Sequence, residues 1–72
     1  MQTKTMRVYD WFLDNPGAWT TKRARRPLRK DGIRVSRSTI YSALKILEHN
    51  GFATRRGGGR NTEWVVSDRE EK

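Results

Sequence analysis

Apolar positions recur at helical spacing in the segment 36–51, which reads SRSTIYSALKILEHNG. This spacing predicts an amphipathic helix with one buried stripe. The buried stripe consists of Ile40, Ala43, Leu44 and Leu47. The opposite, open stripe consists of Ser38, Ser42, Lys45 and His49. Ser36 is a preferred residue type for a helix N-cap, and Asn50-Gly51 provides residues that tolerate the left-handed conformation at a helix end.

The segment Thr3 to Asn15 has a second helical pattern, and Asn15-Pro16-Gly17 ends it in a turn. Its predicted core face consists of Met6, Tyr9, Phe12 and Leu13. Val8 and Trp11 fall outside this arc, so the helix has more apolar surface than one buried stripe requires. Two interpretations follow. Trp11 packs under a terminus or against the last strand, or Val8 and Trp11 form a self-association surface and are possible dimer contacts.

A basic helix is predicted over about Lys22 to Asp31, with Thr20 or Thr21 as its N-cap. Its inward residues are Ala24 and Leu28. Pro27 in the middle of this helix deletes one hydrogen bond and costs about 3 kcal/mol. The sequence therefore leaves two possibilities open: one kinked helix, or a helix that begins near Arg26 with Pro27 in its first turn.

Three short runs are strand-like, and they cover residues 18–20, 52–56 and 62–66. The last two flank the glycine-rich segment 57–61, which predicts a hairpin. Alternation along the last run points Trp64 and Val66 toward the core, and we expect Trp19 to fill the core as well. The charged tail from Asp68 is expected to fray.

The order helix, short strand, helix, turn, helix, hairpin predicts an α+β fold that is mainly helical. It is the order of a three-helix winged helix-turn-helix with a C-terminal β-hairpin wing. The 72 residues are expected to form a single domain, residues 1–72, with an ordered core of about 4–67. A domain of this size buries only about 60% of the surface of its unfolded chain, so its core is thin and has no room for a deep active-site cleft.

Charge is the most informative feature of the composition. The chain has 16 Lys and Arg against 8 Asp and Glu, a net charge of +8, and the span 22–60 holds 12 of the basic residues and only 2 acidic ones. A basic surface that only aids solubility is one interpretation. Clustering of positive charge in this way favours the other, a binding surface for a polyanion.

Catalysis and metal binding find little support in the residue types. The chain has one His and no Cys, its acids are dispersed, and Gly57-Gly58-Gly59 lacks the Lys-Ser/Thr pair and following helix of a phosphate loop. We expect no enzyme activity, no metal, no cofactor and no small-molecule ligand. The lack of Cys suits a reducing cytosol. Without a signal-peptide pattern or an apolar run of about 18 residues, we expect no membrane contact and a cytoplasmic, nucleoid-associated protein.

The segment 32–52 resembles the recognition-helix region of bacterial winged helix-turn-helix repressors. Residues 36–51 follow the pattern Ser-x-x-Thr-aliphatic-Tyr-x-x-Leu-x-x-Leu-Glu-x-x-Gly. This is most similar to the DNA-binding half of the ferric uptake regulator family and more loosely similar to the GntR and PadR families. The resemblance covers about Trp19 to Ser67 and implies DNA binding. Metal sensing and effector control are not implied, because the residues and domains that perform them in those families have no counterpart here.

The open stripe of helix 36–51 is a candidate DNA reader, because an α-helix fits the major groove and its first turns reach base edges. Candidate base-reading residues are Arg37, Ser38, Thr39, Tyr41, Ser42 and Lys45. The resemblance implies that Tyr41 lies on the DNA, and the alternative is that Tyr41 packs at the helix edge. Candidate contacts to the backbone or minor groove are Thr21, Lys22, Arg23, Arg26, Arg29, Arg34, Arg55, Arg56, Arg60 and Asn61. His49 is interpreted as a solvated surface residue.

These features lead to the hypothesis of a small transcriptional regulator or repressor that binds double-stranded DNA sequence-specifically, with a homodimer as the expected form. Two alternatives stay open. The Arg-rich helix favours an architectural or RNA-binding basic protein. An exposed Val8 and Trp11 would favour a winged-helix module that docks a partner protein.

Overall fold

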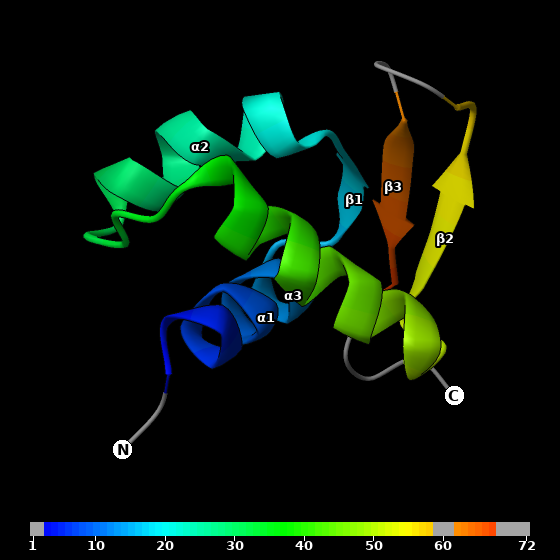
Figure 1. The fold of residues 1–72 in the computed structure, drawn as a ribbon, viewed down its shortest axis with the longest axis horizontal. Helices are drawn as coiled ribbons and strands as arrows, with labels where there is room; N and C mark the ends of the chain where they lie inside the picture. The colour runs from blue at the N-terminus through cyan, green and yellow to red at the C-terminus, as the bar shows by residue number, and fades with distance from the viewer. Residues whose placement is uncertain (1–2, 59–61, 68–72) are drawn as a thin grey trace.

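The computed structural model describes residues 3–58 and 62–67, which form an α+β fold that is mainly helical. In chain order its elements are α1 (Lys4–Asp14), β1 (Gly17–Trp19), α2 (Thr21–Lys30), α3 (Arg37–His49), β2 (Ala53–Arg56) and β3 (Glu63–Val66). The helices gather beside a small sheet, with α3 crossing in front of α1 and α2 lying along the upper edge (Figure 1). Within the described ranges, no helix combines the length and the apolarity that crossing a bilayer requires.

A hydroxyl side chain caps the N-terminus of each helix. The Thr3 hydroxyl accepts a hydrogen bond from the Met6 backbone at 3.2 Å, and the Thr20 hydroxyl accepts one from the Arg23 backbone at 3.0 Å. Thr20, and not Thr21, is therefore the cap of α2. Ser36 caps α3 as the sequence predicts. These caps satisfy backbone N–H groups that a helix leaves unpaired at its start.

Helix α2 is one continuous helix that contains Pro27, so the predicted alternative of a start near Arg26 is wrong. Ala24 and Leu28 on either side of Pro27 are both fully buried, which holds the helix against the core across the missing hydrogen bond. Beyond Pro27, the Asp31 backbone N–H reaches the Pro27 and Leu28 carbonyls at 3.1 Å. Burial and the helix end thus compensate for the proline.

The sheet is antiparallel with the strand order β1-β3-β2. Strand β3 is central and pairs Trp64 with Trp19 on one side and with Arg55 on the other. Trp64 and Val66 are 1% and 2% exposed, so the predicted alternation is confirmed. The first strand begins at Gly17 rather than at Ala18 and makes the expected hairpin part of a three-stranded sheet.

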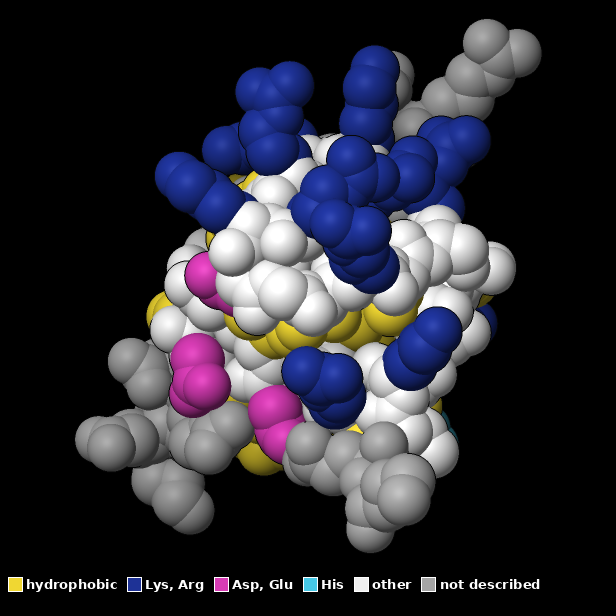
Figure 2. All heavy atoms as spheres, turned by 90° about the vertical axis from the view of Figure 1, so that its left-hand side faces the viewer, with side chains coloured by type: hydrophobic (Ala, Val, Ile, Leu, Met, Phe, Trp, Pro, Cys, Tyr) yellow, Lys and Arg dark blue, Asp and Glu magenta, His cyan; other side chains and the backbone are white. Residues whose placement is uncertain are grey.

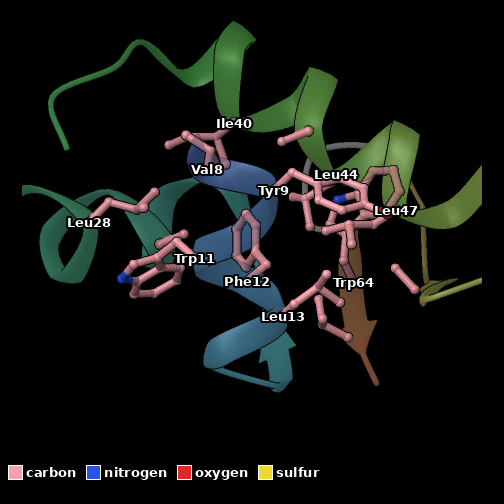
Figure 3. Packing of buried hydrophobic residues seen from close by; sticks show 14 residues of the cluster. Val8, Tyr9, Trp11, Phe12, Leu13, Leu28, Ile40, Leu44, Leu47 and Trp64 are labelled. Atoms are coloured by element: carbon pink, nitrogen blue, oxygen red, sulfur yellow. The ribbon is translucent and has the colours of Figure 1, made fainter. Parts of the chain in front are cut away.

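Helix α1 buries a different arc from the predicted one. Val8 is fully buried and Trp11 is 7% exposed, whereas Met6, assigned to the core face from the sequence, is 37% exposed. Val8, Trp11 and Phe12 point into the core that α1 shares with α2 and α3 (Figure 3). The buried arc is wider and is rotated because α1 packs against more than one neighbour. Val8 and Trp11 therefore do not form the exposed self-association surface proposed from the sequence.

Among the described residues, the ring contacts and the hydrogen bond of Trp11 are with α1, β1 and the end of α2. Its ring makes edge contacts with Phe12 and with Trp19 of β1, at centroid distances of 5.3 and 5.2 Å. Its indole Nε1 donates a 2.6 Å hydrogen bond to Asp31 Oδ2 at the end of α2. Burial of the indole is favourable because its one polar atom is satisfied.

Candidate nucleic-acid interface

The apolar stripe of α3 is completely buried, and this leaves the opposite, open face of the helix exposed. Ile40, Ala43, Leu44 and Leu47 are all 0% exposed, as the sequence predicts. Of the candidate base-reading residues, the exposed ones are Arg37, Ser38, Tyr41, Ser42 and Lys45. Thr39 is half-buried at the edge of this face. The structure thus brings five of the six predicted reading residues onto one accessible helix face.

Hydroxyl groups are linked at the start of α3. Ser36 Oγ accepts from the Thr39 backbone N–H at 3.4 Å and lies 2.9 Å from Ser38 Oγ and 3.3 Å from Thr39 Oγ1. Ser36 has one hydroxyl hydrogen, so it can donate to only one of the two neighbouring hydroxyls. The neighbour that accepts from Ser36 keeps its own hydrogen for an external acceptor. The first turn therefore presents an oriented hydroxyl donor.

Tyr41 joins the open face of α3 to the sheet. Its ring meets Trp64 of β3 edge-on at a centroid distance of 5.8 Å, and Lys45 Nζ lies 5.9 Å from the ring centre. The side chain is nevertheless 44% exposed, and its hydroxyl has no hydrogen-bond partner among the described residues. Tyr41 is therefore both a packing residue and an accessible one, which combines the two interpretations that the sequence leaves open.

Arg55 of β2 is committed to contacts within the protein. Its Nη2 donates to Glu48 Oε1 of α3 at 2.8 Å, and its guanidinium carbon lies 4.7 Å from the Trp64 ring centre. The hydrogen bond that Arg55 donates to Glu48 is the main cause that raises the pKa of the Arg55 guanidinium above its usual value. Arg55 thus anchors β2 to α3, and its predicted contact with the DNA backbone stays a prediction.

The outer face of α2 is uniformly basic. Its exposed residues are Lys22, Arg23, Arg25, Arg26, Arg29 and Lys30. Lys and Arg side chains gather in the upper part of Figure 2, where α2 lies in Figure 1, and Asp and Glu side chains lie below them. Arg23 is placed over the Trp19 ring at 5.9 Å. Thr21 is half-buried, and so this predicted backbone contact is less accessible than its basic neighbours.

A hollow of about 390 Å³ separates α2 from the start of α3 and from the start of α1. Its lining residues are Lys4, Arg25, Arg29, Arg34, Val35, Ser36 and Thr39. Arg29 and Arg34 are predicted backbone contacts, whereas Lys4 and Arg25 are not among the predicted site residues. Lys4 lies far from the others in sequence, and no local pattern signals that α1 packing brings it beside Arg34.

The wing contributes Arg56, which is exposed at the end of β2. Together with Thr20, Gly57 and Glu63, Arg56 lines a second hollow of about 440 Å³ between the wing and the start of α2. Arg60 and Asn61, the predicted contacts at the wing tip, lie outside the described residues. Their role stays a prediction.

The element order and the sheet topology are those of a winged helix-turn-helix. Comparison of this chain with protein-family models, with curated proteins and with solved structures found no match. In the part of the chain that the structure describes, there is no group of three or more His, Cys, Asp or Glu side chains able to hold a metal ion.

Proposed function

We propose that this protein binds double-stranded DNA sequence-specifically and acts as a small transcriptional regulator or repressor. In this proposal α3 enters the major groove with Arg37, Ser42 and Lys45 toward the base edges, and the wing lies on the backbone or in the minor groove. The phosphate contacts that fix the position of α3 are made by Lys22, Arg23, Arg26, Arg29 and Arg34. Such a regulator would be cytoplasmic and associated with the nucleoid.

The observation that carries this proposal is the charge of the open face of α3. Glu48 is the only acid in α3, and Arg55 neutralises it with a 2.8 Å ion pair at the C-terminal end of the helix. The N-terminal half of the open face therefore presents only neutral and cationic polar groups, and it continues into the basic surface of α2. A duplex placed on α3 would meet no unpaired carboxylate of that helix.

The structure bears differently on the two alternative functions, protein docking and RNA binding. A protein-docking role was inferred from an exposed Val8 and Trp11, and both side chains are buried. Homodimer formation stays part of the proposal, without these residues as its contacts. An RNA-binding role rests on the same basic α2 as DNA binding does. A-form RNA has a deep, narrow major groove that excludes a helix, so equal-length DNA and RNA duplexes distinguish the two.

The experiment is selection of bound duplexes from a random pool at a fixed, stated salt concentration. We expect an enriched consensus, and a palindromic one if the protein binds as a dimer. Arg37→Ala and Ser42→Ala should each relax preference at particular base pairs by about 1–3 kcal/mol, whereas Arg60→Ala should weaken all sequences alike and lower the salt slope by about one unit. Unchanged relative affinities in both α3 variants would show that α3 does not read the sequence.

A further inference from the structure

Basic side chains from three separate parts of the chain line the hollow beside the first turn of α3. Lys4 is the first residue of α1, Arg25 and Arg29 are one turn apart on α2, and Arg34 lies in the connection to α3. The remaining lining residues are Val35, Ser36 and Thr39. No acid is among the lining residues in the described part of the chain. The charged residues that line the hollow are thus all cationic, and two hydroxyl groups lie beside them.

Nothing within the described part of the protein neutralises these four side chains. Arg55 pairs with Glu48, and none of these four basic side chains makes an ion pair or a hydrogen bond with another described residue. Asp31, the nearest acid in sequence to Arg29 and Arg34, accepts a hydrogen bond from Trp11. Like charges one helical turn apart repel, so Arg25 and Arg29 are unfavourable neighbours without an anion between them.

Size and chemistry restrict what this hollow can hold. A volume of about 390 Å³ lies within the range of small-ligand pockets. Its lining is charged rather than apolar, which disfavours a hydrophobic ligand, and four cations exclude a metal ion. The planar guanidinium group of Arg can donate two parallel hydrogen bonds to two oxygens of one phosphate. The Ser36 and Thr39 hydroxyls add neutral hydrogen-bonding groups at the start of α3.

The geometry points to a phosphate-binding pocket formed by Lys4, Arg25, Arg29 and Arg34. The phosphate belongs either to the backbone of a bound duplex or to a free phosphorylated compound, and both sources offer the same oxygens to the four cations. The inference rests on the proposed function only where the phosphate is that of DNA. In that case the pocket fixes one backbone position directly beside the first turn of α3, which sets the register of the reading helix.

The first arm of the test uses the free protein. Inorganic phosphate and then triphosphate are titrated at constant ionic strength, and backbone amide shifts are followed by NMR. We expect saturable shifts confined to the lining segments, and we expect Arg34→Gln and Lys4→Gln each to weaken triphosphate binding about tenfold. Lys30→Gln is the matched control, because it removes the same charge from the exposed end of α2 without touching the hollow. It should change binding by about twofold or less, through the screened long-range field alone.

The second arm uses a selected duplex in which single phosphates are replaced by neutral methylphosphonates. If the pocket holds a backbone phosphate, one replacement weakens wild-type and Lys30→Gln binding but has no further effect on Arg34→Gln. If free phosphate saturates the pocket and no backbone position is coupled to Arg34, the source is a free phosphorylated compound.

The two arms also separate this inference from the proposed function. Shifts that stay linear and spread over all basic residues, together with equal behaviour of Arg34→Gln and Lys30→Gln on DNA, would overturn the pocket while leaving DNA binding intact. Saturable, Arg34-dependent phosphate binding by a protein that selects no duplex would support the pocket and refute the proposed function.

Discussion

Replacing Tyr41 by Phe removes one hydroxyl group from the open face of α3 and leaves the ring in place. The ring packs edge-on against Trp64 at 5.8 Å and lies beside Lys45 Nζ at 5.9 Å. Because the hydroxyl has no partner among the described residues, its loss should change the free energy of unfolding by less than about 0.5 kcal/mol. Stability and DNA affinity are thus separable at this position.

The expected loss of affinity follows from the partner that the hydroxyl would meet. A hydrogen bond to a neutral base edge contributes about 0.5–1.5 kcal/mol and one to a charged phosphate about 1.5–3 kcal/mol. We therefore expect Tyr41→Phe to weaken binding about tenfold, which corresponds to about 1.4 kcal/mol. Tyr41→Ala should in addition lower the free energy of unfolding by about 0.5–1.5 kcal/mol, because the aromatic contact with Trp64 is lost.

Fluorescence anisotropy with a selected duplex measures the affinity, and urea unfolding measures the stability. His49→Gln is the control, because His49 is exposed at the C-terminal end of α3, far from the N-terminal turns proposed to contact DNA. The reasoning is refuted if Tyr41→Phe binds as tightly as the wild type while Tyr41→Ala does not. In that case Tyr41 acts only by packing the wing against α3, and the DNA contact implied by the family resemblance is absent.

Two further predictions concern contacts that fix the helices and the wing. Trp11→Phe should lower the free energy of unfolding by roughly 1–3 kcal/mol, since it removes the 2.6 Å hydrogen bond to Asp31 and part of the buried ring. Unchanged stability in urea together with a changed sedimentation coefficient would contradict this and place Trp11 at an interface between protein copies. Glu48→Gln should release Arg55 toward DNA and steepen the salt dependence of binding by about one unit more than Glu63→Gln does, and equal slopes for the two variants would contradict this.

Local signals predicted α3 well because everything that defines it lies within the helix and its caps. The 3.6-residue spacing of Ile40, Ala43, Leu44 and Leu47 assigns the buried face, and Ser36 and Gly51 mark the limits. Gly51 adopts φ +84°, a conformation that Gly accepts without strain. The same locality explains why the alternation of Trp64 and Val66 gave their burial correctly.

The sequence failed where distant segments decide the outcome. A helical wheel of α1 cannot tell that Val8 and Trp11 face α2 and α3 while Met6 stays near solvent. Pro27 counts against a helix locally, yet the burial of Ala24 and Leu28 overrides it. Arg55 carries no sequence mark that predicts its ion pair with Glu48. Its role depends on strand β2 returning alongside the end of α3.

The charge distribution gives α2 an unusual dependence on its surroundings. This helix of ten residues buries only Ala24 and Leu28 and carries six cationic side chains with no acid among them. Its own sequence therefore supplies repulsion, and its stability comes from the Thr20 cap, the two buried side chains and the Trp11–Asp31 tether beyond its end. A polyanion on its outer face would remove the repulsion, and any ligand that binds only the folded state stabilises that state. Phosphate binding and the folding of α2 would then be thermodynamically linked. The phosphate contacts that position α3 would also stabilise α2.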